Sequence, residues 1–181
     1  MHDTLLTSRN GNTDAFQKLV ETYQGYAYSL AVRFLGNEED ALDVTQEAFI
    51  RIWKHLPNFD SRCKFTTWMY RIVTNLCIDR VKTGNRREQE MPPGFQEQLM
   101  AAVDIEDENI KKQLAGIITG FAADLTPRQQ AVFVLRDLQD LSVVEVAEVL
   151  DISKSSVKSN LCYARQNIRK RLEHLEQNRR R

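Results

Sequence analysis

The chain has 181 residues, of which 42% are hydrophobic, 28% charged and 8% aromatic, as in an ordinary globular protein. This length allows one domain, or two small ones with limited cores. Seven glycines and four prolines exclude a collagen-like chain and long disordered tracts. No apolar run approaches the ~18 residues that span a bilayer, and the start of the chain lacks signal-peptide character, so we expect a cytoplasmic protein.

Cysteine and histidine residues are scattered along the chain. The cysteines are odd in number and form no CxxC arrangement, which argues against a disulfide scaffold or a zinc ribbon and fits a reducing cytosol. The histidines are equally far apart, so we expect neither a metal site nor a cofactor. These residues are Cys63, Cys77 and Cys162, and His2, His55 and His174.

Charge is distributed unevenly, although the chain has 25 basic and 25 acidic residues. Residues 1–82 are balanced, residues 83–113 hold four basic and seven acidic side chains, and residues 114–151 hold two and six. Residues 152–181 carry nine cations against two carboxylates. So abrupt a change of sign indicates a localised anionic partner. The alternative is a basic helix end that is stabilised by its own dipole.

Helical periodicity dominates the first part of the chain. Apolar residues recur every three or four positions over residues 16–34, and Gly36 is placed to end this helix. Asn37 or its neighbours can cap a second helix, which Pro57 closes. A third helix is expected from about Phe65 to Val81. No segment has the alternating pattern of a half-buried strand, so the sequence predicts an all-α fold.

A linker is expected over residues 83–113, where the composition becomes polar and acidic. Thr83-Gly84-Asn85 is predicted to break the helix, and Met91-Pro92-Pro93-Gly94 cannot be helical throughout. A flexible coil of this length reaches roughly 30 Å and extends to about 100 Å. The sequence therefore predicts two small helical domains, residues 1–82 and 114–181, on a flexible tether.

The second domain has the pattern of a helix-turn-helix. Thr126-Pro127-Arg128-Gln129 predicts a capping box with proline at the first helical position, and Ser142-Val143-Val144-Glu145 repeats the box. A tight turn at Asp151-Ile152-Ser153 then leads to a helix from about Lys154 toward Leu175.

The last helix presents a polar face suited to DNA. Hydroxyls and cations near a helix N-terminus can bind phosphates and base edges, and such a helix fits the major groove. The alternative is a helical bundle with a solvated polar face. The candidate residues are Lys154, Ser155, Ser156, Lys158, Ser159, Cys162, Tyr163 and Arg165.

Two further sets of residues are candidates in the first domain. Around the start of the third helix, aromatic rings that can stack unpaired bases alternate with cations, although helix-core spacing explains several of the rings equally well. In the second helix, three polar residues share one exposed face that could dock a basic protein surface or could simply be solvated. The first set includes Arg62, Lys64, Phe65, Trp68, Arg71 and Asn75, and the second is Asp43, Gln46 and Glu47.

No phosphate-binding glycine loop, nucleophile elbow or HExxH motif is present, so we expect no enzyme and no small-molecule substrate.

These stretches, in this order, resemble a bacterial RNA polymerase sigma factor of the extracytoplasmic-function (ECF) group. AFQKLVETYQGYAYSLA, DALDVTQEAFIRIW and KFTTWMYRIVTNLCIDR resemble the sigma-two domain, and the stretch from Leu125 to Leu172 resembles the sigma-four domain. The resemblance covers nearly the whole chain. It implies a sigma-two-like bundle and a sigma-four-like helix-turn-helix that bind core RNA polymerase and promoter DNA to initiate transcription.

The resemblance also implies a role for each set of residues. Asp43, Gln46 and Glu47 would dock on core polymerase, and Lys154 to Arg165 would read the duplex minus-thirty-five element. The minus-ten element would be melted, and a base of the single-stranded non-template strand captured, by Ser61, Arg62, Lys64, Phe65, Trp68, Arg71 and Asn75. Relatives are often inhibited by an anti-sigma factor, commonly membrane-bound, so such a partner is implied here.

Departures from the family pattern affect the promoter-reading face. Asn160, Cys162 and Tyr163 replace residues common in relatives, and Asp151 stands where a turn glycine is usual, although Asp tolerates that conformation. Two alternatives stay open on the residues alone. One is a stand-alone helix-turn-helix regulator whose first domain binds another protein, and the other is a structural helical adaptor.

Overall fold

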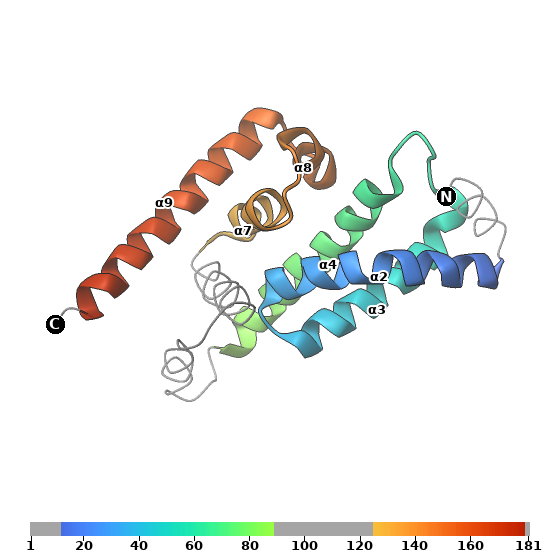
Figure 1. Cartoon of the computed structure of the whole chain (residues 1–181), viewed down its shortest axis with the longest axis horizontal. Helices are drawn as coiled ribbons and strands as arrows, with labels where there is room; N and C mark the ends of the chain where they lie inside the picture. The colour runs from blue at the N-terminus through green and yellow to red at the C-terminus, as the bar shows by residue number, and fades with distance from the viewer. Residues whose placement is uncertain (1–11, 89–124, 180–181) are drawn as a thin grey trace.

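The computed structural model describes residues 12–88 and 125–179, and these residues form helices and no strand (Figure 1). The prediction of an all-α fold is therefore confirmed. The first module contains α2 (Thr13–Leu35), α3 (Glu38–His55), the short 3-10 helix η1 (Leu56–Asn58) and α4 (Phe65–Glu88). The second contains α7 (Pro127–Phe133), the π-helix η2 (Val134–Leu138), α8 (Val143–Leu150) and α9 (Lys154–Arg179).

The junction between α2 and α3 follows the sequence signals. Gly36 adopts a left-handed conformation with φ of 69°, and its N–H donates to the Val32 carbonyl at 2.9 Å. Asn37 then caps α3, because its side-chain oxygen accepts the Asp40 N–H at 3.0 Å. The predictions that Gly36 ends one helix and Asn37 caps the next are confirmed.

Helix α4 is longer than predicted. It continues to Glu88, so the predicted helix break at Thr83-Gly84-Asn85 is wrong. A single glycine costs a helix only about 1 kcal/mol, and the Thr83 hydroxyl donates to the Asp79 carbonyl at 2.8 Å inside the helix. The rest of the predicted linker, including Met91-Pro92-Pro93-Gly94, lies outside the described residues up to position 113.

Both predicted capping boxes are present in the second module. Thr126 Oγ1 accepts the Gln129 N–H at 3.3 Å, and Gln129 Oε1 accepts the Thr126 N–H at 3.1 Å. Ser142 and Glu145 repeat this exchange at 3.2 and 2.9 Å. Asp151 takes the left-handed conformation expected of it, with φ of 52°, at the turn into α9.

The π-helix η2 was not predicted. The Gln139 N–H donates to the Val134 carbonyl five residues earlier, at 3.0 Å, and Asp140 follows with φ of 56°. No residue type in this stretch differs from those of an ordinary α-helix, so the sequence carries no clear signal for the wider turn. Such turns are rare and often occur at functional sites.

The two modules pack against each other through one continuous set of buried apolar residues. Helix α4 contacts α7 and α8, and η2 contacts α2. Gln130 of α7 is 3% exposed and donates to the Phe34 carbonyl at 2.8 Å across the boundary. Helix α9 packs on α7 and α8, and its C-terminal end lies away from the α2–α4 bundle (Figure 1).

Candidate protein and nucleic-acid interfaces

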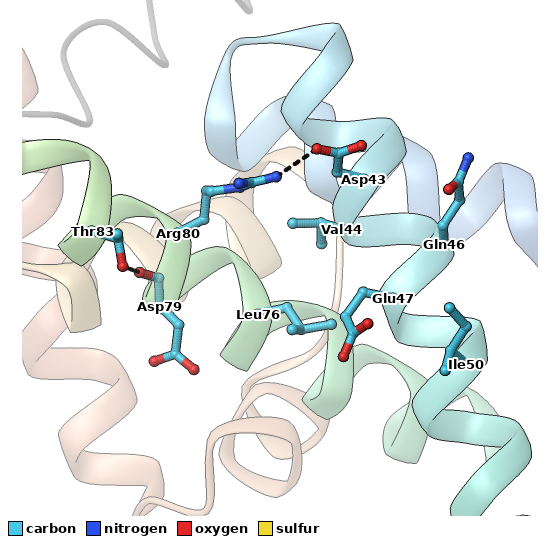
Figure 2. A pocket seen from close by; sticks show the side chains of 9 residues that line it. All are labelled: Asp43, Val44, Gln46, Glu47, Ile50, Leu76, Asp79, Arg80 and Thr83. Atoms are coloured by element: carbon cyan, nitrogen blue, oxygen red, sulfur yellow. Dashed lines mark hydrogen bonds and ion pairs between the residues drawn. The ribbon is translucent and has the colours of Figure 1, made fainter. Parts of the chain in front are cut away.

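A groove of about 460 Å³ runs between α3 and α4 and contains the first predicted site (Figure 2). Asp43, Gln46 and Glu47 line it from α3, as the sequence predicted for one face of that helix. Its other lining residues are Val44 and Ile50 of α3, and Leu76, Asp79, Arg80 and Thr83 of α4. The α4 wall was not predicted, although positions 76, 79, 80 and 83 have the three- and four-residue spacing of one helix face.

Ion pairs hold two of the groove carboxylates. Arg80 Nη2 lies 2.8 Å from Asp43 Oδ2, and Arg80 Nε lies 3.3 Å from Asp40 Oδ1. Arg51 Nε lies 2.8 Å from Glu47 Oε1. All these side chains are more than a third exposed, so each pair contributes at most about 1 kcal/mol and can exchange for an outside cation.

Apolar surface accompanies the acidic rim of this groove. Ile50, which lines the groove from α3, is 47% exposed, and Val44 and Leu76 are buried beneath the groove. Carboxylates around exposed aliphatic side chains suit a helix with basic residues and apolar anchors. The groove therefore combines carboxylates with exposed apolar surface.

The predicted base-capturing aromatics differ in their exposure. Phe65 is 5% exposed and packs into the core, with its ring centroid 4.9 Å from Tyr23, so it has no open face for a base. Trp68 is half-buried and lies against Phe59, with centroids 4.8 Å apart. Asn75, farther along α4, is exposed. Of the two predicted base-capturing rings, only that of Trp68 therefore reaches the surface. The Phe65 ring packs beneath it.

Each predicted cation of the minus-ten set has an acceptor within the chain. Arg62 pairs with Asp60 at 2.7 Å, and hydrogen bonds to this carboxylate raise the Arg62 pKa. Lys64 Nζ lies 3.7 Å from Glu145 Oε1 of α8. Arg71 donates to the Glu148 and Val149 carbonyls at 2.5 and 3.3 Å. Ser61, in the loop before α4, is exposed.

The Glu145 carboxylate has two functions at the boundary between the modules. Oε2 completes the α8 capping box, and Oε1 faces Lys64. Hydrogen bonds from the backbone N–H and the hydroxyl of Ser142, helped by the Lys64 charge, lower the Glu145 pKa. The carboxylate is therefore held in its charged form beside Lys64.

Most of the predicted DNA-contacting residues of α9 are exposed to solvent. They lie on the side opposite Val157, Leu161 and Ala164, which are buried. Ser153 caps the helix, because its hydroxyl accepts the Ser156 N–H at 3.1 Å. Ser156 is half-buried, and its carbonyl and hydroxyl bind the Asn160 amide at 2.8 and 3.3 Å. The exposed members are Lys154, Ser155, Lys158, Ser159, Cys162, Tyr163 and Arg165.

Arg165 differs from the other exposed cations of α9. Its Nε and Nη2 bind the Asp137 carboxylate at 2.8 and 2.7 Å, and these hydrogen bonds raise the Arg165 pKa. Asp137 is on η2, and its side chain is 18% exposed. The predicted DNA-contacting residue therefore also connects α9 to the π-helix.

The described residues form neither a metal cluster nor a membrane-spanning helix. Residues 12–88 and 125–179 bring together no group of three His, Cys, Asp or Glu side chains that could hold a metal ion. Among the same residues, no helix is both long and apolar enough to span a bilayer. Cys63, Cys77 and Cys162 carry free thiols.

Comparison with known proteins accounts for both modules. Residues 19–87 match the family model "Sigma-70 region 2", and residues 121–168 match "Sigma-70, region 4". The chain is 32% identical to the ECF RNA polymerase sigma factor SigW of Bacillus subtilis, over 92% of this chain and 94% of that protein. The chain belongs to the ECF RNA polymerase sigma factors. The ECF RNA polymerase sigma-E factor of Escherichia coli is 29% identical over 96% of this chain and 95% of its own length.

A solved structure shares the fold of this ECF sigma factor over both modules. CnrH, in complex with the cytosolic domain of CnrY, superposes with a TM-score of 0.67 and 25% identity, covering 94% of this chain and 96% of CnrH. The family assignment confirms the resemblance read from the sequence. Sigma factors bind core RNA polymerase and promoter DNA, and they are not a family of enzymes. The stand-alone regulator and the structural adaptor are thereby set aside.

Proposed function

We propose that this chain directs core RNA polymerase to a set of promoters by binding polymerase with its first module and DNA with both. The observation that carries the proposal is the occurrence of both sigma regions in one chain, together with the acidic α3–α4 groove and the cationic face of α9. Because α4 continues to Glu88, the functional division would be residues 1–88 for polymerase and the minus-ten element, 89–113 as linker, and 114–181 for the minus-thirty-five element.

The groove between α3 and α4 would receive a basic helical surface of core polymerase. Asp43 and Glu47 would exchange their internal partners, Arg80 and Arg51, for polymerase cations, while the Gln46 amide donates or accepts beside them. The exposed Ile50 side chain would supply apolar contact. An acidic rim also raises the rate of encounter with a cationic partner.

Promoter opening would depend on the start of α4 and the loop before it. Trp68 offers an aromatic surface for an unpaired base, and the exposed Asn75 amide can read a base edge. Ser61, Arg62, Lys64 and Arg71 would follow the backbone of the non-template strand. Phe65 would act indirectly, by supporting Trp68 from the core.

Duplex recognition would depend on the N-terminal half of α9. Lys154 and Lys158 lie one turn apart where phosphates or base edges would approach, and Ser155 and Ser159 form a neighbouring pair. Tyr163 is 59% exposed and can contact a base or a sugar. Because Cys162 and Tyr163 depart from the residues common in relatives, the promoter read by this face would be its own.

An anti-sigma factor would regulate the chain. The fold is shared with CnrH, solved with the cytosolic domain of CnrY, and with the sigma factor RpoE, solved with the anti-sigma factor NepR of Bartonella quintana. An inhibitor of this kind would cover the polymerase-binding and DNA-binding surfaces. The chain would act in the cytoplasm, where polymerase and promoters are, and would carry out no catalysis itself.

Reconstituted transcription tests the proposal directly. Purified chain and core polymerase are incubated with a library of randomised promoter sequences, and the transcripts are sequenced. We expect transcripts that depend on the chain and share two sequence elements. The absence of any chain-dependent transcript, from a chain that is folded by circular dichroism, would refute the proposed function.

A further inference from the structure

The positive charge of α9 is confined to one edge of the helix over residues 154–169. Exposed cations recur there at spacings of four, seven and four residues, at Lys154, Lys158, Arg165 and Arg169. Because an α-helix turns by about 100° per residue, these spacings keep the four side chains within about 60° of one another. They form a single line along the helix, which we call the cationic row. No other cation occurs in this stretch.

The opposite edge of α9 is uncharged. Polar and aromatic side chains recur on it at spacings of four, three and four residues and form a neutral row of Ser156, Asn160, Tyr163 and Asn167. Between the two rows lies an exposed central row of Ser155, Ser159, Cys162 and Gln166. No acidic residue occurs from Lys154 to Leu172, so the difference between the two edges comes from the placement of the cations alone.

Contacts within the chain increase this difference between the edges. In the neutral row, Asn160 Nδ2 donates to the carbonyl and hydroxyl of Ser156 at 2.8 and 3.3 Å, and both side chains are half-buried. In the cationic row, Arg165 pairs with Asp137, whereas the two lysines make no ion pair among the described residues. The cationic row therefore has charge available for an outside anion, and part of the neutral row is occupied internally.

A helix in the major groove has the phosphates of a different DNA strand beside each edge, because the groove is only about 12 Å wide and the two backbones form its walls. Cations neutralise phosphates and release counterions, whereas hydroxyls and amides contribute hydrogen bonds alone. The cationic row extends over 15 residues, or about 22 Å, which matches about six phosphates of one strand. The two strands should therefore contribute unequally to binding by α9.

We infer that α9 neutralises the phosphates of only one strand of the upstream promoter duplex. This inference rests on the proposed function. The cationic row lies along one backbone and supplies the salt-dependent part of the affinity. The neutral row lies beside the other backbone and contributes hydrogen bonds that depend little on salt. The central row faces the base edges between them, so the bases that it reads decide which strand the cations follow.

Strand-specific removal of phosphate charge tests the inference on the full chain. A labelled duplex is first enriched from a randomised library by binding to the chain. Uncharged methylphosphonates then replace about six consecutive phosphates across the site, in one strand or in the other. Fluorescence anisotropy gives the affinity for each duplex. We expect the replacement to weaken binding at least about tenfold in one strand and less than about threefold in the other.

A variant with cations on both edges extends the test. Asn160→Arg combined with Asn167→Arg adds two charges to the neutral row. We expect both strands then to be sensitive to methylphosphonates, and the slope of log affinity against log salt concentration to steepen by about 2. The control is Gln17→Arg with Gln24→Arg, which adds the same charge at exposed positions of α2 and should change neither result. Asn167→Arg alone, at an exposed position, repeats the measurement if the double variant unfolds.

Other outcomes separate this inference from the proposed function. Equal weakening by methylphosphonates in either strand would overturn the inference for the wild type. So would no weakening in either strand, which would mean that the cationic row faces something other than DNA, and so would a library from which no duplex is enriched. Transcription by the wild type with core polymerase is assayed in parallel. If transcription succeeds while the two strands contribute equally, only the inference about the strands fails.

Discussion

Arg165 and Asp137 form a bidentate ion pair, at 2.8 and 2.7 Å, that joins α9 to the π-helix η2. Such paired N–H···O bonds are geometrically specific and fix the relative position of the two groups. The Arg165 side chain is 58% exposed, so the pair is screened by solvent. The ion pair therefore fixes the orientation of α9 relative to η2, and it adds only modestly to the stability of the fold.

Removal of the Asp137 carboxylate should show how the ion pair affects DNA binding by α9 and how much it stabilises the fold. Asp137→Ala leaves Arg165 free for phosphate, so we expect two- to fivefold tighter binding of duplex DNA and a loss of stability of about 0.5–1 kcal/mol. Anisotropy at fixed salt and urea denaturation give the two values. Asp137→Asn is the matched variant, which keeps one hydrogen bond without the charge. Weaker DNA binding by Asp137→Ala would mean that the orientation of α9 matters more than the freed charge.

Reversal of charge in the α3–α4 groove should weaken polymerase binding. We expect Asp43→Arg with Glu47→Arg to lower affinity for core polymerase by more than tenfold, because two attractive contacts become repulsive. Binding is measured by competition against the wild-type chain. The control is Glu21→Arg with Glu38→Arg, which makes the same charge change at exposed positions outside the groove lining. Equal loss in the control would indicate an effect of net charge rather than a docking site.

Substitution of two aromatic residues of α4 should have different effects, one on promoter opening and the other on stability. We expect Trp68→Ala to lower promoter opening roughly tenfold and to leave polymerase binding intact, since stacking of one base contributes about 1–3 kcal/mol. We expect Phe65→Ala to destabilise the fold by about 3–5 kcal/mol, because its ring is buried. Permanganate footprinting and urea denaturation distinguish the two. Full opening by Trp68→Ala would remove this residue from base capture.

Local chemistry made much of the fold predictable. The capping boxes at Thr126 and Ser142, the stop at Gly36 and the left-handed Asp151 each depend on neighbours within four residues, which the sequence displays directly. The π-helix and the contact between the modules depend on tertiary packing. Arg71 carries no signal that its acceptors are backbone carbonyls 77 and 78 residues away.

Helical spacing predicted which faces are exposed, and it was a weaker guide to which side chains are buried. Helical spacing placed Asp43, Gln46 and Glu47 on one groove wall, but it could not distinguish a stacking ring from a core ring, and Phe65 proved to be buried. The pairing of Arg165 was equally invisible, since Asp137 is 28 residues away and its approach depends on η2. Sequence periodicity gives the direction of a side chain along its own helix and leaves its distant partners undetermined.

One cation of α9 should account for about one released counterion. The logarithm of duplex affinity against the logarithm of salt concentration should have a slope of roughly −4 to −5 for the full chain, and Lys158→Ala should reduce its magnitude by about 1. Polymerase binding should not change. Lys54→Ala, an exposed cation of α3, is the control. A slope near zero for the wild type would exclude phosphate contacts by α9.

Burial of the Cys77 thiol should make the fold sensitive to alkaline pH. Desolvation raises the Cys77 pKa from 9.0 to about 12, so the native state keeps a proton that the unfolded state releases above about pH 9. The stabilisation is complete below that pH and is lost as the pH rises toward 12, at about 1.4 kcal/mol per pH unit. Urea denaturation of the reduced protein between pH 8 and 11 measures this slope. Cys77→Ala has no thiol there and reports the background from other groups, so its stability should fall less steeply. Parallel curves would show that Cys77 titrates normally in the folded chain, and that its surroundings admit water.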